Sequence, residues 1–373
     1  MFCIFIKVNS MRYLPSLLLL LPLTLFAQRK QVDSSLTISF EDYDPPSSLV
    51  VPEHHPTAAS IPFLDVHSHH WRMGEQDLDK LIREMDSLNM RVIVNLSGRG
   101  GQALKGMMDN INKHGYQDRI VCFTNIDIRS IDDPDYLEST LAQLEYDRSI
   151  GARGLKIYKS QGMTHTDKAG NRIPINDERL RPIFRRAGEL GMPVLIHYAD
   201  PKQFWQPHDG NNERWLELKL RPNRKRAADD PASWETIAAE AHDLFASNPG
   251  TTFIAAHMAW FANDLTYLGE FLDRNPNVYV EIGAVIAELG RQPRAANRFF
   301  AAYQDRVLFG KDSYRPAEYA TYFRVLETDD EYFPYYKRYH AFWRMYGLDL
   351  PKPILEKLYY KNALRIIPDL KPW

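Results

Sequence analysis

The sequence predicts an α/β protein, a (β/α)8 TIM barrel, on three observations. Eight apolar or β-branched runs of strand length are bounded by Gly, Pro, Asn or Asp. Amphipathic stretches of helical length lie between them, and most units are about thirty residues long, the size of a strand plus its crossover helix. Eight such units in series favour a barrel. An open doubly wound sheet is the alternative, but no Gly-x-Gly-x-x-Gly turn follows the first strand.

The elements are expected in the following order. The strands are predicted at residues 61–69, 91–97, 119–128, 152–159, 192–199, 251–259, 278–284 and 306–312. Five helices are predicted between them, at residues 76–88, 136–150, 178–190, 234–247 and 265–274. The first helix illustrates the basis, because its apolar residues fall on one face, namely Leu78, Leu81, Ile82 and Met85.

Two connections and the tail depart from this repeat. Residues 160–176 and 200–231 lengthen the units after the fourth and fifth strands. Because loops after barrel strands surround the active site, both are candidate lids, with surface decoration as the alternative. An aromatic-rich segment over 314–346 and a last helix over 354–365 follow the eighth strand, and we expect this tail to pack across the barrel.

The N-terminus has the features of an export signal. Met11-Arg12-Tyr13 precedes an almost wholly apolar stretch over 14–26, and Ala27-Gln28 follows. We expect a signal peptide over 1–27, with Met11 as an alternative start, an extended arm over 28–60, and the barrel with its helical tail over 61–373. A retained membrane anchor is disfavoured because the apolar core is short. The expected location is periplasmic or secreted.

Composition narrows the function classes. The chain has 373 residues, 44% hydrophobic and 25% charged, which is ordinary for a globular protein with a large core. Its net charge of −2 gives no electrostatic argument for nucleic acid. Removal of the signal would leave Cys122 as the only cysteine, so no internal disulfide is expected. A small-molecule substrate is the expected partner, without a stable membrane anchor.

The first predicted strand ends in a candidate metal site. Its sequence, Asp65-Val66-His67-Ser68-His69, spaces two histidines at i and i+2. Alternate side chains of a strand point the same way, so Asp65, His67 and His69 should share one face. Two adjacent imidazoles suit a divalent metal such as zinc. A polar strand end is the alternative, and further ligands must exist elsewhere for the metal hypothesis to hold.

Such residues end three later strands. The fifth predicted strand ends at His197, the sixth at His257, and the eighth runs out at Asp312. The carboxyl ends of barrel strands meet on one face of the fold, so these side chains should lie near the first two histidines.

At these residues the chain resembles the metal-dependent amidohydrolase superfamily. The resemblance is to the amidohydrolase-related branch that includes aminocarboxymuconate-semialdehyde decarboxylase-like enzymes. It rests on the Asp65–His69 motif, Leu195-Ile196-His197, Ala255-Ala256-His257, Phe309-Gly310-Lys311-Asp312-Ser313 and the closing helix, and it spans about residues 61–367. It implies that His67, His69 and His197 bind a divalent metal, usually zinc. Asp312 would be a further ligand or proton acceptor, and His257 would polarise the substrate or stabilise the transition state.

Further residues are candidates for supporting roles. Lys156 and Tyr158 should face the barrel interior, since Leu155 and Ile157 alternate with them. Some superfamily members carboxylate a lysine here to bridge two metals, but we favour one metal per chain and a Lys156 that binds an anionic substrate or pairs with Asp312 or Glu281. Asp65 is expected to orient the histidines, and Glu281 to support a ligand.

Three residues are candidates for substrate binding. Tyr198 and Trp260 stand beside the proposed ligands in the sequence, and each has a packing role as its alternative. Arg99 follows the second strand among glycines and is a candidate partner for a substrate carboxylate, with a simple turn as the alternative.

Three functions fit this pattern. The first is a metal-dependent hydrolase, in which metal-activated water attacks an amide, ester or lactone of a small molecule. The second is a nonoxidative decarboxylase that uses the same site. The third is a metal-retaining binding protein without catalysis. The expected export favours hydrolysis, by association with extracellular breakdown of nutrients.

Overall fold

The computed structural model describes residues 33–340 and 343–373. The chain divides into two compact units, Met1–Tyr43 and Asp44–Trp373. The expected signal peptide over 1–27 lies outside the described residues. The described part of the expected arm, 33–60, contains turns and extended chain and is mostly exposed. The helices and strands of the described residues all lie in the second unit.

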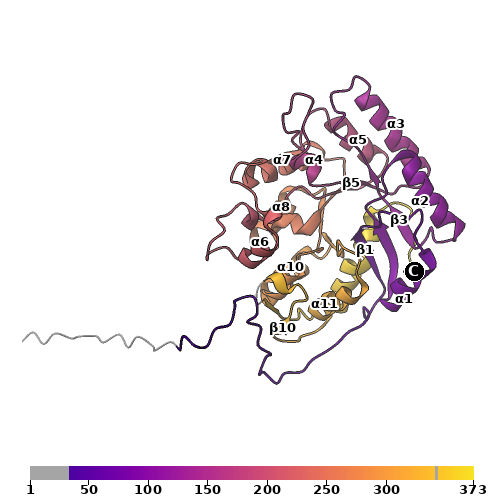
Figure 1. Cartoon of the computed structure of the whole chain (residues 1–373). Helices are drawn as coiled ribbons and strands as arrows, with labels where there is room; N and C mark the ends of the chain where they lie inside the picture. The colour runs from indigo at the N-terminus through magenta and orange to yellow at the C-terminus, as the bar shows by residue number, and fades with distance from the viewer. Residues whose placement is uncertain (1–32, 341–342) are drawn as a thin grey trace, which may run out of the picture. The chain divides into compact units, whose positions relative to one another are not determined.

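Two parallel sheets form the centre of this unit (Figure 1). One sheet has the order β1-β2-β3 and the other the order β4-β5-β6-β7-β8-β9. The strands are β1 (Phe63–Ser68), β2 (Met90–Asn95), β3 (Ile120–Cys122), β4 (Thr124–Asn125), β5 (Leu155–Ile157), β6 (Val194–Ile196), β7 (Phe253–Ala255), β8 (Val278–Glu281) and β9 (Val307–Leu308). All eight predicted strands therefore exist, in the predicted order, and β3 with β4 correspond to the single strand predicted over 119–128.

Hydrogen bonds outside the two sheets join them into a ring. Phe123, the residue between β3 and β4, donates its N–H to Asn95 of β2 at 3.0 Å. At the other junction, Val66 of β1 donates to the carbonyl of Phe309 at 3.0 Å, and Asp312 donates to the carbonyl of His67 at 2.7 Å. The first and last strands are therefore neighbours, and the parallel strands close as in a (β/α)8 barrel.

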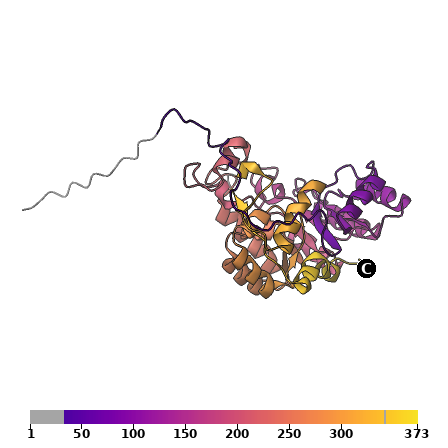
Figure 2. The same ribbon diagram turned by 90° about the horizontal axis from the view of Figure 1, so that it is seen from below.

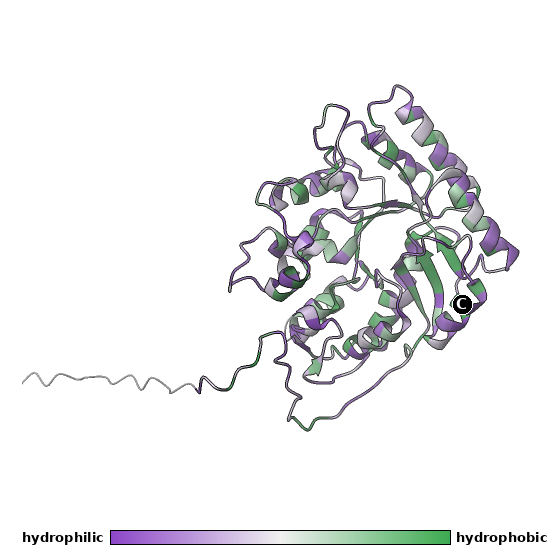
Figure 3. Ribbon diagram, in the orientation of Figure 1, coloured by the Kyte–Doolittle hydropathy of each residue, from purple (hydrophilic) through white to green (hydrophobic). Residues whose placement is uncertain are grey.

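Helices follow the strands on the outside of the ring. The longer helices are α1 (Leu78–Ser87), α2 (Gly101–Lys113), α3 (Tyr136–Ser149), α5 (Arg181–Glu189), α7 (Trp234–Ser247), α8 (Leu265–Arg274), α10 (Pro293–Tyr303) and α11 (Pro316–Glu327). All five predicted helices are among them, and the buried residues of α1 are the four predicted ones. The strands are mostly hydrophobic and the helices mix hydrophobic and hydrophilic residues, as Figure 3 shows.

Three of these helices were not predicted. Helix α2 starts in the glycine pair Gly100-Gly101, which suggested a turn, yet it buries Leu104, Met107, Met108 and Ile111 at helical spacing. Helices α10 and α11 both begin at a proline, a residue that the first turn of a helix tolerates well.

The C-terminal tail closes the barrel at the end where the strands begin. It consists of α12 (Lys352–Glu356), a π-helical turn (Lys357–Lys361) and α13 (Asn362–Ile366). Ala363 and Ile367 join the apolar cluster inside the barrel, and Asn362 donates its side-chain N–H to the carbonyl of Val307 at 2.8 Å. Figures 1 and 2 both place the C-terminus beside the first strands. The opposite end of the barrel, where the strands end, is left open for a functional site.

Phe309 connects the last strand to this tail and to helix α11. Its ring centroid lies 4.9 Å from that of Phe63, 5.4 Å from that of Tyr359 and 5.8 Å from that of Tyr322. The side chain is fully buried.

We expect Phe309→Ala to lower the free energy of unfolding by about 3–5 kcal/mol, because it leaves a cavity among these rings. Denaturant unfolding followed by circular dichroism measures this loss. Leu220→Ala, at a side chain that is 50% exposed, is the control and should change the free energy by less than about 0.5 kcal/mol. A similar loss in both variants would contradict the importance of the aromatic cluster.

Candidate metal and catalytic site

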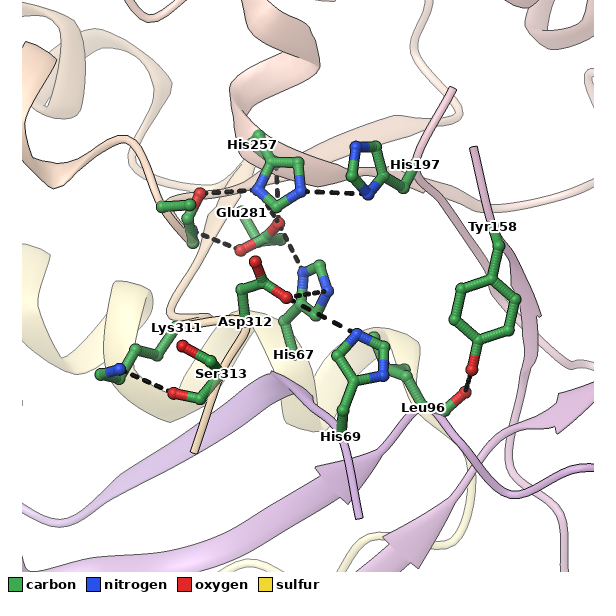
Figure 4. Close-up of polar contacts among 12 residues, drawn as sticks. His67, His69, Leu96, Tyr158, His197, His257, Glu281, Lys311, Asp312 and Ser313 are labelled. Atoms are coloured by element: carbon green, nitrogen blue, oxygen red, sulfur yellow. Dashed lines mark hydrogen bonds and ion pairs between the residues drawn. The ribbon is translucent and has the colours of Figure 1, made fainter. Parts of the chain in front are cut away.

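The histidines and acids predicted from the strand ends converge at the open end of the barrel (Figure 4). Two overlapping sets of ligand atoms lie within 4.8 Å of one another. One set consists of His67, His69 and Asp312, and the other of His67, His257 and Glu281. His197 stands outside both sets, with its ring centroid 4.4 Å from that of His257.

Glu281 at the end of β8 holds this cluster together. Its Oε1 accepts hydrogen bonds from Nδ1 of His67 at 2.9 Å and from the backbone N–H of His257 at 2.7 Å. Its Oε2 accepts the N–H of Gly283 at 2.5 Å. The carboxylate is fully buried, and burial raises its pKa. Glu281 therefore fixes the orientation of His67 and is also a member of one of the two ligand sets.

Space for this carboxylate depends on two glycines. A Cβ at Gly310 would lie 2.3 Å from Oε2 of Glu281, and one at Gly283 would lie 2.6 Å from the same atom. Real Cβ atoms do not approach so closely, so both positions require glycine while Glu281 keeps its place.

The Nε2 atoms of His67 and His69 both face the carboxylate of Asp312. Nε2 of His67 is buried without a hydrogen-bond partner and lies 3.5 Å from Oδ1 of Asp312. Nε2 of His69 lies 3.6 Å from the same oxygen, while its Nδ1 hydrogen-bonds with Oγ of Ser97 at 2.7 Å. Since Nδ1 of each imidazole has an oxygen partner, Nε2 of each is left to bind a cation.

His197 and His257 repeat this arrangement. Nε2 of His197 donates to the carbonyl of Ala199 at 2.7 Å, and Nδ1 of His257 donates to the carbonyl of Gly283 at 2.7 Å. The remaining nitrogens face each other at 3.4 Å. Two neutral imidazoles cannot both present lone pairs at this distance without a proton or metal between or beside them. The donor set thus fits a divalent metal.

Burial keeps the histidines neutral, the form in which imidazole binds metal. It lowers the pKa of His67 and of His197 well below the usual value, and lowers that of His69 to about 4. Burial alone would raise the pKa of Asp312, but positive charge at the surrounding His67, His257, His69 or Lys156 lowers it below its ordinary value. A set of neutral imidazoles beside one carboxylate suits a borderline divalent cation such as zinc.

A left-handed turn aims His257 into the site. His257, Met258, Ala259 and Trp260 all have φ between 52° and 62°, a conformation that costs non-glycine residues about 1–2 kcal/mol each. Hydrogen bonds hold the turn: Glu281 accepts from His257, Tyr198 donates to the carbonyl of Ala259, and Trp260 Nε1 donates to the carbonyl of Ala199 at 2.5 Å. Strain retained in this way is typical of functional sites.

A cavity of about 160 Å³ lies against the cluster. His197, His257, Trp260 and Asp312 form one wall. The other lining residues are Lys159, Asp200, Pro201, Phe204, Arg214, Glu217, Arg224, Ala284, Lys337, Tyr339 and His340. Residues 200–231 therefore do cover the site, as expected, whereas residues 160–176 do not line this cavity. Lys337, Tyr339 and His340 come from the aromatic-rich segment, whose lack of regular periodicity gave no signal for a site.

Tyr198 is not placed at this cavity. Successive residues of a strand point to opposite sides, so the neighbour of His197 points outward. Tyr198 is accordingly buried in the helical layer, with its ring 6.5 Å from that of Phe245. Arg99 does not line this cavity either, but lines another depression with Trp71 and Tyr158, whose rings stack on that of His69.

Asp65 orients the histidine motif through the backbone instead of through the imidazoles. A register shift in β1 between Asp65 and Ser68 breaks the strict alternation on which the shared face was predicted. Oδ1 of Asp65 accepts the N–H of His67 at 2.9 Å and that of Lys311 at 3.1 Å, and Oδ2 accepts the hydroxyl of Tyr319 at 2.5 Å. Burial raises the pKa of Asp65 to about 7.

Lys156 points into the barrel, as the alternation predicted. Leu155 and Ile157 pack in the outer apolar layer, and Lys156 is fully buried with no hydrogen-bond partner for Nζ. Burial lowers its pKa to about 7, against the attraction of Asp312 and Glu281. No ion pair among the described residues joins Lys156 to either acid.

Solved proteins share the fold of this chain. No curated protein matches it. A solved 2,6-dihydroxybenzoate decarboxylase is 12% identical, with a TM-score of 0.51 over 83% of this chain and 99% of that one. An uncharacterised TIM-barrel protein from Bordetella bronchiseptica is 15% identical, with a TM-score of 0.49 over 82% of this chain and 98% of that one. At 12% identity the decarboxylase shows the fold alone.

Among the described residues, no helix is long and apolar enough to span a bilayer.

A family model covers most of the barrel. The model described as amidohydrolase matches residues 128–368, which include His197, His257, Glu281 and Asp312 but begin after the first histidine pair. The match extends over more than half of the sequence and over the strands that supply most of the cluster. The chain belongs to the amidohydrolase family.

Proposed function

We propose that this protein is a metal-dependent hydrolase that cleaves an ester, lactone or amide bond of a small molecule. The observation that carries the proposal is the position of Asp312, whose Oδ1 lies 3.5 Å and 3.6 Å from the free Nε2 atoms of His67 and His69 at the wall of a cavity. A carboxylate beside a cation site is the arrangement needed to accept a proton from an activated water.

His67, His69, His197 and Asp312 would hold the metal, for which zinc is our first choice because three of the four ligands are imidazoles. When bound, such a metal lowers the pKa of water and polarises a carbonyl group. We propose one metal per chain, with Lys156 uncarboxylated, because the two ligand sets share His67 and Nζ of Lys156 has no hydrogen-bond partner among them.

Three of the protein's own residues would then carry out separate parts of the reaction. Asp312, whose side chain is 37% exposed, takes the proton of the attacking water and passes it to the leaving group. His257 is fixed through Nδ1 by the carbonyl of Gly283, which leaves its Nε2 facing the site, and the protonated imidazolium would stabilise negative charge on the reacting oxygen. Trp260, with its ring 4.6 Å from that of His257, walls the site against bulk water.

A decarboxylase is the second candidate, favoured by one observation. Lys156 is buried beside the cluster without a hydrogen-bond partner, and a substrate carboxylate that reached it would be held in place while its C–C bond breaks. Hydrolysis of an ester or lactone at neutral pH consumes added base, whereas decarboxylation releases carbon dioxide. Measuring both on a panel of carboxylated esters and lactones separates the two reactions, and carbon dioxide without base uptake would contradict the hydrolase.

Elemental analysis of protein purified without chelator should find about one zinc per chain, since the two ligand sets in the barrel share His67 and cannot each hold a metal through it. Two metals per chain would support a carboxylated Lys156 instead. Absence of any divalent metal, together with no binding on addition of zinc, would contradict the proposed function.

Asp312→Asn is expected to lower kcat by about 10²–10⁴-fold, because the amide cannot accept the proton. Steady-state kinetics on the zinc-loaded variant measures this loss. Asp109→Asn, at an exposed position of α2, is the control and should leave kcat unchanged. If Asp312→Asn kept its metal and its full turnover, another residue would have to be the base. Ligand binding without turnover in the unaltered protein would instead indicate a non-catalytic binding protein.

Glu281→Gln is expected to weaken zinc affinity by about 10–100-fold, because an amide cannot accept all three hydrogen bonds that orient His67 and the left-handed turn after β7. Competition with a chromophoric chelator measures this affinity. Glu138→Gln, at an exposed position of α3, should bind zinc as the unaltered protein does. Equal affinity in the Glu281 variant would show that the imidazoles hold their positions without the carboxylate.

A further inference from the structure

The cavity wall that faces the histidines is built by two segments far apart in the sequence. Residues 200–224 supply Asp200, Arg214, Glu217 and Arg224, and residues 337–340 supply Lys337. Both segments lie outside the repeat of strands and helices that forms the barrel. Their side chains can therefore determine which molecule enters the cavity.

The acids of this wall are already neutralised. Asp200 pairs with Lys159 and, at 2.8 Å, with Arg226. Glu217 pairs with Arg214 at 2.8 Å and with Arg224. A second carboxylate, Glu288, pairs with Arg214 from behind the wall.

Lys337 is the exception among the charged lining residues. None of the ion pairs or hydrogen bonds among the described residues involves its ammonium group, which lies 5.7 Å from the ring centroid of Tyr336, and the residue is partly buried. Asp312 lines the same cavity but lies beyond ion-pair distance. Burial lowers the pKa of Lys337, which the charge of Asp312 opposes. A partly buried cation without a counter-ion is costly, so this position is poised to gain one.

We propose that Lys337 binds a carboxylate of the substrate that lies away from the bond that reacts. This proposal rests on the proposed function, since it assumes that the reacting group is held at Asp312. One lysine balances one negative charge, and a cavity of about 160 Å³ holds only a small molecule. The substrate is therefore a small compound with a carboxylate at one end and the hydrolysable bond at the other.

Binding of dicarboxylates to the zinc-loaded protein tests this assignment. The probes are succinate, glutarate and adipate, each compared by isothermal titration calorimetry with the monocarboxylate of the same chain length. At least one dicarboxylate should bind about tenfold more tightly than its partner, the effect of one charge-assisted hydrogen bond. Lys337→Met should reduce that ratio to below about twofold, and Lys337→Arg should retain most of it.

Lys225→Met is the matched control, because it removes the same charge from an exposed position that does not line the cavity. Its dicarboxylate preference should equal that of the unaltered protein. The proposal is overturned if no dicarboxylate is preferred, or if Lys337→Met keeps the preference. If Lys337→Met does not fold, as judged by circular dichroism, Lys337→Gln takes its place with the same expected outcome.

The two proposals fail separately. Titration measures binding without turnover, so a protein that prefers dicarboxylates through Lys337 but hydrolyses no ester or lactone contradicts the hydrolase and leaves the role of Lys337 intact. A protein that hydrolyses esters but binds mono- and dicarboxylates equally contradicts the role of Lys337 and leaves the hydrolase intact.

Discussion

The candidate site depends on the buried carboxylate of Glu281. Its two oxygens accept three hydrogen bonds from residues of three different segments, namely His67, His257 and Gly283. A carboxylate taken out of water needs such partners, because an unpaired buried charge costs several kcal/mol. The same bonds turn Nε2 of His67 toward Asp312 and hold the first residue of the left-handed turn. Removing the carboxylate would therefore loosen both halves of the cluster together.

A second buried carboxylate, that of Asp65, holds together the junction between the first and last strands of the barrel. Asp65 connects the backbone of His67 to that of Lys311 and is itself held by Tyr319 of helix α11. The neighbouring backbone bond from Asp312 to His67 runs across the same junction. Metal ligands from the first and last strands are thus positioned by the bonds that close the ring, so stability of the barrel and geometry of the site rest on shared contacts.

The strand order and the convergence of the histidines could be predicted from the sequence because both follow from simple geometry. Apolar runs of strand length are strong signals, and the carboxyl ends of parallel strands meet on one face, which brings His67, His257 and Asp312 together. Alternation also placed Lys156 inside the barrel. The same rule, applied one residue further, would have placed Tyr198 outside; its position beside His197 in the sequence was the wrong guide.

Other features have no local signal. The left-handed turn after β7 is stabilised by Glu281 and Tyr198, which are distant in the sequence, so nothing in Ala256–Trp260 predicts it. The break of register in β1 depends on pairing with β2 and gave Asp65 a different set of partners from those alternation suggested. Lys337 lies in a segment without periodicity, and only the folded chain shows that it shares a cavity with Asp312.

These two unpaired lysines bear on which reaction the family scaffold performs here. Lys156 lies inside the barrel beneath the cluster, and Lys337 lies in the wall of the cavity that covers it. A substrate carboxylate bound at Lys156 would place the carboxylated carbon at the reacting position, as loss of carbon dioxide requires. A carboxylate bound at Lys337 would place the far end of the molecule beside Asp312, as attack by water on an ester or lactone requires. The cavity opens on Lys337 and not on Lys156, which is the geometric ground for proposing hydrolysis first and decarboxylation second.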